Sequence, residues 1–360
     1  MAIQLCDLSS ELLEGVAFYL SSKDCLCFML TCKYVHEVVS VAPMYHAVQL
    51  VKTSATSAFP AQLLLDQLTR NPAAGRWIKH YNLLAAFGPT NDEEICNTSY
   101  HIGLALMLLQ KMPNLLSLSI PRLPRLATAS YVTSLFHNVL EAKSLVEVLL
   151  ENSTASYNIS FDQVRPLFTL PALRSLGFTG FDLEPIPVPL KTDAICKTVI
   201  ELRLHGGTSN SKSLVNLFAT FPNVKLFQAD LVNNLSAANI IDAIVKHYPA
   251  LYSLDLAQHD SKTDKVRDDW LRELPNLRTL YITDTALTWK SLDWLPASVT
   301  YVDIVQQILL PTSVALAIDR WAKGPELPHR RTVTVNDQGK DNILQKLIIV
   351  CLIALAYDCS

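Results

Sequence analysis

Residues 274–282, LPNLRTLYI, carry the pattern that decides the fold of this chain. Apolar residues stand at Leu277, Leu280 and Ile282, which gives the spacing apolar-x-x-apolar-x-apolar. The alternation of Leu280 and Ile282 with Thr279 and Tyr281 is typical of a short strand with one buried face. The proline at 275 ends any helix before it, because proline lacks a backbone N–H and clashes with the preceding turn. The stretch therefore predicts a helix that ends just before a short strand.

The same pattern recurs along the chain. Four other stretches keep the nine-residue form, with starts at Met112, Leu170, Phe221 and Tyr248. Three more keep only its second half, over 145–150, 199–204 and 299–304. The first apolar position of the shared core falls at 115, 145, 173, 199, 224, 251, 277 and 299, so successive copies lie 22 to 30 residues apart. We expect an earlier copy at Ile78–Leu83, and a late copy around Val333 and Val335 is left open.

A helical stripe of apolar residues precedes most copies. Examples are Leu214, Leu217, Phe218 and Phe221, and then Ile241, Ile244, Val245 and Tyr248. One helix and one strand cannot bury their apolar faces alone, so we expect the units to stack into a curved solenoid with a parallel sheet on its inner face. A doubly wound α/β enzyme is the rival architecture. The regular spacing and the low glycine content, 10 in 360 residues, disfavour it.

This core resembles the L-x-x-L-x-L of leucine-rich repeats, although the asparagine that often follows the strand in that family is mostly absent. The resemblance implies an α/β horseshoe over 111–336, preceded by a linker and a first degenerate repeat over 51–110. Residues 337–360 would form a C-terminal cap or an apolar tail. The apolar run at 347–357 is too short to span a membrane, which takes about 20 residues. It is either a terminal helix or strand or a membrane-surface tail.

Composition argues for an interaction protein that has no catalytic residue. Half of the residues are apolar and the net charge is −3, so we expect a large core and neither a nucleic-acid nor a membrane partner. We find no phosphate-binding glycine loop, H-E-x-x-H, G-x-S-x-G or C-x-x-C motif, and we expect no cofactor, no metal and no enzymatic activity. The eight cysteines are interpreted as buried, reduced thiols, which favours the cytoplasm, the nucleus or both.

The first 50 residues form a different module, which we expect to be three short helices. Apolar residues stand four apart in the first helix, a second begins after Ser22, and the third carries Val35, Val38 and Val39. The serines at 9 and 10 suit the start of the first helix, and Asp24 suits the start of the second. So small a unit needs a partner to be stable, either the adjoining repeats or another protein.

The module resembles an F-box. The matching residues are Leu8, Glu11, Leu12, Val16, Leu20, Asp24, Leu26, Leu30, Cys32 and Lys33. Ser9 replaces the usual proline, and Tyr34, Val35 and His36 stand where a tryptophan often follows the Cys-Lys pair. The segment from Asn71 to Leu83 resembles the start of the repeats in fungal F-box proteins.

The resemblance implies a fungal-type substrate receptor of a Skp–cullin–F-box ubiquitin ligase. Its F-box would bind a Skp-type adaptor, and through it the cullin, while the repeats bind a protein substrate. The adaptor contacts or their immediate support would be Leu8, Leu12, Val16, Leu20, Leu26 and Leu30. The alternative is a leucine-rich-repeat interaction scaffold whose N-terminal helices only cap the solenoid.

Alternate strand positions should line the concave face of the solenoid. They are mostly small, polar, charged or tyrosine, and either form a merely solvated sheet or bind a partner. Our candidates for substrate contacts are Glu201, Arg203, Asp255, Tyr281 and Asp303. His205, Asp230, Asp255 and Ser253 do not indicate a catalytic triad, because neighbouring strands bring such residues together in any case.

Overall fold

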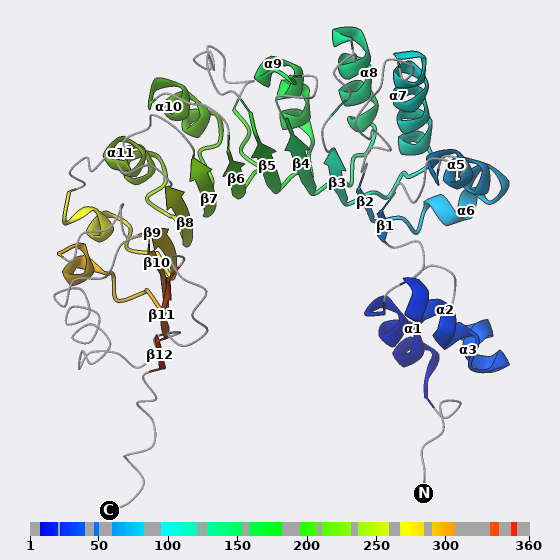
Figure 1. Cartoon of the computed structure of the whole chain (residues 1–360), viewed down its shortest axis with the longest axis horizontal. Helices are drawn as coiled ribbons and strands as arrows, with labels where there is room; N and C mark the ends of the chain where they lie inside the picture. The colour runs from blue at the N-terminus through cyan, green and yellow to red at the C-terminus, as the bar shows by residue number, and fades with distance from the viewer. Residues whose placement is uncertain are drawn as a thin grey trace, which may run out of the picture. The chain divides into compact units, whose positions relative to one another are not determined.

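The structure is a computed structural model that divides into two compact units, Met1–Leu173 and Arg174–Ser360. It describes residues 8–20, 22–39, 47–49, 60–82, 95–120, 123, 128–152, 158–181, 195–206, 211–231, 237–258, 267–283, 290–306, 332–337 and 347–350. In both units, parallel strands alternate along the chain with helices, as Figure 1 shows. The predicted α/β class is therefore confirmed.

The first unit begins with three short helices that share a core of their own. They are α1 (Ser10–Phe18), α2 (Ser22–Met29) and α3 (Lys33–Val38), close to the predicted positions. The buried residues that form the core are Leu13, Ala17, Cys25, Met29, Val35 and Val39. Ser9 is the N-cap of α1, but its side chain makes no capping hydrogen bond. Asp24 lies in the first turn of α2, as expected.

The rest of the first unit alternates strands and helices. Its elements are β1 (Ala47–Gln49), α5 (Pro60–Arg70), α6 (Pro72–Gly75), β2 (His80–Asn82), α7 (Ile95–Gln110), β3 (Ser117–Ile120), α8 (Ala129–Val139), β4 (Glu147–Glu151), α9 (Phe161–Val164) and the 3-10 helix η3 (Arg165–Thr169). Strands β1 to β4 pair in parallel and in chain order. The strand β2 matches the expected early copy. The strand β1 is a correction to our expectation of helices alone in residues 1–50, since three residues are too few for a periodic signal.

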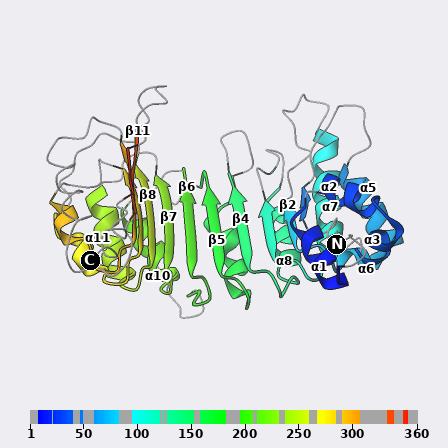
Figure 2. The same cartoon turned by 90° about the horizontal axis from the view of Figure 1, so that it is seen from below.

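The second unit continues the alternation. Its elements are β5 (Ser175–Thr179), β6 (Glu201–His205), α10 (Ser211–Thr220), β7 (Leu226–Leu231), α11 (Ala237–His247), β8 (Ser253–Gln258), η5 (Trp270–Glu273), β9 (Thr279–Thr283), η7 (Ser291–Trp294), β10 (Tyr301–Gln306), β11 (Thr332–Asp337) and β12 (Leu347–Val350). Strands β5 to β11 pair in parallel and in chain order, and β12 is antiparallel to β11. The arrows of β5 to β8 point the same way in Figure 2.

This strand order decides between the two architectures. A doubly wound sheet reverses its strand order at a switch point, whereas each unit here keeps the order of the chain. The strand β11 contains Val333 and Val335 and so confirms the late copy. Of the apolar C-terminal run, 347–350 is a strand rather than a helix, and 351–357 lies outside the described residues.

The apolar positions of the repeat form the core. The first position of each of the eight copies is at most 2% exposed, from Leu115 to Val299. Both predicted helical stripes are buried as well. In the second unit Phe218 packs against Phe227 and Tyr248, with ring centroids 5.3 and 4.9 Å apart. The helix-to-strand pattern therefore places its apolar residues as predicted.

Polar side chains tie successive turns together just before the strands. The Asn114 amide donates to the Arg76 carbonyl at 3.1 Å, and the Asn223 amide donates to the Lys197 carbonyl at 2.8 Å. Ser298 Oγ donates to the Leu277 carbonyl at 2.7 Å. These bonds satisfy backbone carbonyls that the turns would otherwise leave without a partner.

Three further observations concern the described residues only. None of their helices has the length and apolar character needed to span a membrane. They contain no group of three or more His, Cys, Asp or Glu side chains placed to hold a metal ion. Of their cysteines, Cys25 and Cys196 are buried as expected and Cys32 is partly buried. Cys27 is exposed, so the interpretation of the thiols as buried is wrong at that position.

Candidate interaction surfaces

The N-terminal helices expose apolar side chains on the outside of their small core. Leu12 is 59% exposed and Leu30 is 72% exposed, and Val16 is exposed as well. Leu8 and Leu20 are half-buried and pack against the core. The sixth predicted contact, Leu26, has a side chain outside the described set. Three of the six predicted residues are thus accessible, and two support them.

Two tyrosines belong to the same module. Tyr19, directly after α1, is 93% exposed, and it is not among the contacts that we predicted from the sequence. The Tyr34 hydroxyl donates to the Leu8 carbonyl at 3.3 Å, and this bond ties α3 to the residues that lead into α1. Tyr34 therefore holds the residues that lead into the first helix in place.

The sheet of the second unit brings four of the five predicted substrate contacts into one row. The strand register pairs Arg203 with Gln228, Gln228 with Asp255, Asp255 with Tyr281, and Tyr281 with Asp303. Neighbouring members of the row lie about 4.8 Å apart, which is the usual spacing of strands. A partner that crosses β6 to β10 would meet these side chains in sequence. We call this row, together with Glu201, Asp230 and Tyr301, the sheet face of the second unit.

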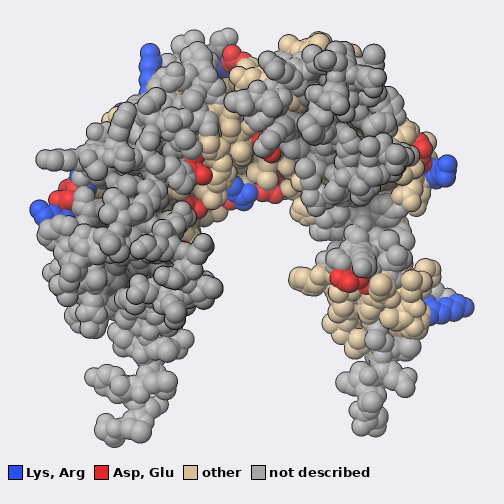
Figure 3. Space-filling view, viewed as in Figure 1, with Lys and Arg blue, Asp and Glu red and all other residues tan. Residues whose placement is uncertain are grey.

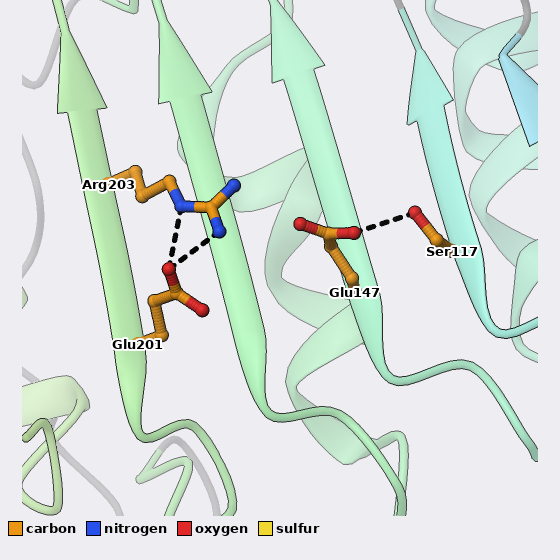
Figure 4. Close-up of polar contacts among 4 residues, drawn as sticks. All are labelled: Ser117, Glu147, Glu201 and Arg203. Atoms are coloured by element: carbon orange, nitrogen blue, oxygen red, sulfur yellow. Dashed lines mark hydrogen bonds and ion pairs between the residues drawn. The ribbon is translucent and has the colours of Figure 1, made fainter. Parts of the chain in front are cut away.

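Glu201 lies one row away, on the same strand as Arg203. Arg203 Nη2 is 2.6 Å from Glu201 Oε1, and Arg203 Nε donates to the same oxygen at 2.8 Å (Figure 4). Both side chains are half-buried. The arginine of the row is therefore already neutralised by a carboxylate.

Carboxylates dominate the remainder of the sheet face. Burial raises the pKa of the Asp255 carboxyl above its ordinary value. The neighbouring Asp230 and Asp303 add to this rise in pKa, and His205 opposes it. Asp303 is only 9% exposed, so it supplies charge to the face rather than contact area. Asp230, Asp255 and Asp303 therefore lie close enough together for their carboxylates to repel one another.

A tyrosine pair lies beside these carboxylates. The rings of Tyr281 and Tyr301 lie 5.1 Å apart and are tilted by 46°. Burial raises the pKa of the Tyr281 hydroxyl, and the neighbouring Tyr301 and Asp303 add to the rise. Tyr301 is not among the substrate contacts that we predicted from the sequence. Its position in the repeat, two residues before Asp303, is the signal that could have identified it.

The register also tests the triad that we set aside. His205 pairs with Asp230 in the row next to Arg203. Ser253, however, pairs with Leu226 and Thr279, in a different row. The three side chains therefore do not form one line across the sheet.

The first unit has a sheet face of its own. Ser117 on β3 pairs with Glu147 on β4, and the serine hydroxyl donates to Glu147 Oε2 at 2.8 Å (Figure 4).

On the face drawn in Figure 3, charged side chains of the described residues stand among many uncharged ones. Charged residues make up 18% of the sequence, which agrees with this distribution.

Comparisons with known proteins give little. No protein-family model matches the chain, and no curated protein matches it. One solved structure that is similar is the tropomodulin C-terminal domain of Caenorhabditis elegans, at 16% identity and a TM-score of 0.26. The match covers 45% of this chain and 85% of that domain.

Proposed function

We propose that this chain is the substrate-recognition subunit of a Skp–cullin–F-box ubiquitin ligase. Helices α1 to α3 act as the F-box and dock on a Skp-type adaptor. The two α/β units act as a leucine-rich-repeat solenoid that holds a protein substrate. The observation that carries this proposal is the apolar surface of the N-terminal helices, which stays exposed although those helices already have a core.

The energetics of that surface support docking. Residues of the three helices alone fill the small core, so Leu12, Val16 and Leu30 are not needed for it. Burying one such side chain contributes about 2 kcal/mol, so the three together offer about 6 kcal/mol to an apolar partner groove. An exposed cluster of this kind on a small helical module is typical of an interaction site.

The repeats support the second half of the proposal. Each copy provides a strand in parallel register, and the strands present charged and aromatic side chains at alternate positions. A receptor of this class performs no bond chemistry. It raises the effective concentration of substrate lysines near the ubiquitin-carrying enzyme.

Adaptor binding tests the proposal. We expect the full chain to bind a purified Skp-type adaptor, and we expect Leu12→Asp plus Leu30→Asp to weaken this binding at least about a hundredfold. Both side chains are exposed, so the change should leave the circular dichroism spectrum and the melting temperature of the chain unaltered. Leu63→Asp plus Met107→Asp is the matched control, because these residues are exposed apolar side chains of α5 and α7. Adaptor binding that survives the first pair of substitutions contradicts the proposal.

The alternative is a repeat scaffold whose first three helices act only as a cap. The order of the elements favours this function, because α1 to α3 come just before β1, the first strand of the unit, where a cap is required. Under the alternative, the wild-type chain does not bind a Skp-type adaptor. Removal of residues 1–39 would then lower the melting temperature of the repeats.

A further inference from the structure

The sheet of the second unit has a second line of side chains, at the edge formed by the N-terminal ends of its strands. One residue directly precedes each of the strands β5 to β10: Arg174, Ile200, Lys225, Tyr252, Arg278 and Thr300. Backbone hydrogen bonds join these residues in order. The Ile200 N–H donates to the Arg174 carbonyl at 2.8 Å, the Lys225 N–H to the Ile200 carbonyl at 2.8 Å, and the Tyr252 N–H to the Lys225 carbonyl at 2.7 Å.

The same bonding continues to the end of the line. The Arg278 N–H donates to the Tyr252 carbonyl at 2.8 Å, and the Thr300 N–H donates to the Arg278 carbonyl at 2.9 Å. The residues are therefore spaced by one strand, or about 4.8 Å. We call Arg174, Ile200, Lys225, Tyr252 and Arg278 the basic edge.

The basic edge alternates cations with apolar residues. Arg174, Lys225 and Arg278 are exposed. Between them Ile200 is 37% exposed and Tyr252 is 42% exposed. No aspartate or glutamate occurs in the described turns before these strands, at 171–174, 195–200, 222–225, 249–252 and 275–278. The edge is therefore positive, whereas the sheet face of the same unit is rich in carboxylates.

The two arginines are held along the edge. Arg174 Nη1 donates to the Thr198 carbonyl at 3.2 Å. The guanidinium carbon of Arg278 lies 5.0 Å from the centroid of the Tyr252 ring, which is a cation–π contact. Side chains already held in this way lose less conformational freedom when a ligand binds.

We propose that the basic edge binds an acidic segment of a partner protein in the polyproline II conformation. Successive cations of the edge lie two strands apart, or about 9.6 Å. A polyproline II segment rises about 3.1 Å per residue with three residues per turn, so every third side chain falls on one face, about 9.3 Å apart. Acidic residues at every third position would therefore meet Arg174, Lys225 and Arg278 in turn.

The apolar members of the edge favour a protein segment over a nucleic acid. Ile200 and Tyr252 lie between the cations and would contact the apolar residues between the acids of the segment. A sugar–phosphate backbone offers nothing apolar to Ile200, and stacking of bases would require more aromatic residues along the line. This inference does not rest on the proposed function, since no residue of the edge belongs to α1 to α3.

A binding experiment with the full chain tests this inference. The probe is a fluorescent peptide of about twelve residues with glutamate at every third position and proline and valine between, followed by fluorescence anisotropy. We expect binding at low salt that weakens as salt is added, because the charges are exposed. Lys225→Glu plus Arg278→Glu should weaken binding at least tenfold. Lys225→Arg, which keeps the charge, should retain it.

The matched control is Lys212→Glu plus Lys246→Glu, which changes the net charge by the same amount at exposed positions on α10 and α11. This control should leave peptide binding unchanged. The inference is overturned if the peptide does not bind, or if both double variants weaken binding equally. Tighter binding of a single-stranded oligonucleotide, or of vesicles that contain anionic lipid, also overturns it. The Lys225→Glu plus Arg278→Glu variant should still bind a Skp-type adaptor. A loss of peptide binding in this variant is therefore distinguishable from a failure of the proposed function.

Discussion

Arg203 and Glu201, two residues apart on β6, are joined through one carboxylate oxygen, at 2.6 Å from Nη2 and 2.8 Å from Nε of the arginine. Arg203 is the single cation among the residues that we chose on the sheet face. Because Glu201 already neutralises it, the pair offers no net positive charge to a partner. Beyond Arg203 the row continues with Gln228, Asp255 and Tyr281, and it ends at the nearly buried Asp303. The sheet face of the second unit therefore presents carboxylates and a tyrosine pair.

The raised pKa of Asp255 predicts how its removal affects stability. Because the folded state holds the proton of this carboxyl more tightly than the unfolded chain does, ionised Asp255 lowers stability at neutral pH. That penalty disappears as the pH falls through the folded pKa. Asp255→Asn should therefore raise the urea midpoint at pH 7 by a few tenths of a molar, and the gain should shrink toward pH 4. The exposed Asp293→Asn is the control and should change nothing. A lower midpoint for Asp255→Asn at pH 7 contradicts this account.

His247 predicts a pH dependence of the opposite sign. Burial lowers the pKa of its imidazole, and the adjacent Lys246 lowers it further. The ring lies 6.3 Å from that of Phe218, and its Nε2 is buried without a hydrogen-bond partner. Neutral His247 contributes its full stability above the pKa of this imidazole in the unfolded chain, which is near 6.5. As the pH falls below that value the unfolded chain takes up the proton first, and the stability is lost as the pH passes through the pKa of the folded chain.

Thermal melts between pH 7.5 and pH 5 measure this effect. The melting temperature of the wild-type chain should fall over this range, and His247→Leu should make the fall smaller. The control is His137→Leu, which replaces an exposed histidine in the last turn of α8. If both variants reduce the pH dependence equally, His247 is not its source.

Much of the fold could be predicted from the sequence because each repeat buries the same positions. Leu277, Leu280 and Ile282 are all at most 1% exposed. Every apolar position of this repeat is therefore buried, and the alternation of apolar and polar residues along its strand is clear in the sequence. The helical stripe from Leu214 to Phe221 is equally regular. Where burial repeats in this way, the apolar pattern alone indicates which residues form the helix, which form the strand, and which side chains face the core.

Other features depend on pairing that no local pattern carries. The strand β1 is three residues long and is defined by its pairing with β2. Lys225 and Arg278 are 53 residues apart in the sequence, so the basic edge emerges only when the strands are aligned in register. Asp303 has the same alternation as Asp255, yet it is nearly buried. Charge and exposure within the candidate surfaces thus follow from tertiary packing.

Two glycines of the first unit, Gly75 and Gly103, should respond very differently to substitution by alanine. A Cβ at Gly75 would collide with the backbone carbonyl oxygen of Lys111, which cannot move as a side chain could. At Gly103 in α7 a Cβ would have open space around it. We expect Gly75→Ala to destabilise the chain by about 1–3 kcal/mol, as overpacking does, and Gly103→Ala to stabilise it by up to about 1 kcal/mol. Urea unfolding of both variants checks this, and a stable Gly75→Ala would contradict the close approach.

Asn152 lies just after β4, and its buried side-chain amide should be costly to lose. Its Nδ2 donates to the Ile159 carbonyl at 3.0 Å, and its Oδ1 accepts the Ile159 N–H at 3.1 Å. Asn152→Leu fills a similar volume but leaves both backbone groups of Ile159 buried without a partner, which should cost about 2–4 kcal/mol. Asn158 is exposed and accepts one hydrogen bond from the Asn152 amide at 3.0 Å, so Asn158→Ala should cost under about 1 kcal/mol.

Urea unfolding and hydrogen exchange together distinguish this role from simple packing. Loss of the two hydrogen bonds should remove exchange protection at the Ile159 amide in Asn152→Leu, while the amides of β4 remain protected. If the Ile159 amide stays protected and the free energy of unfolding is unchanged, Asn152 does not hold this segment. If Asn158→Ala is as costly as Asn152→Leu, the stability comes from the side-chain pair rather than from the bonds to Ile159.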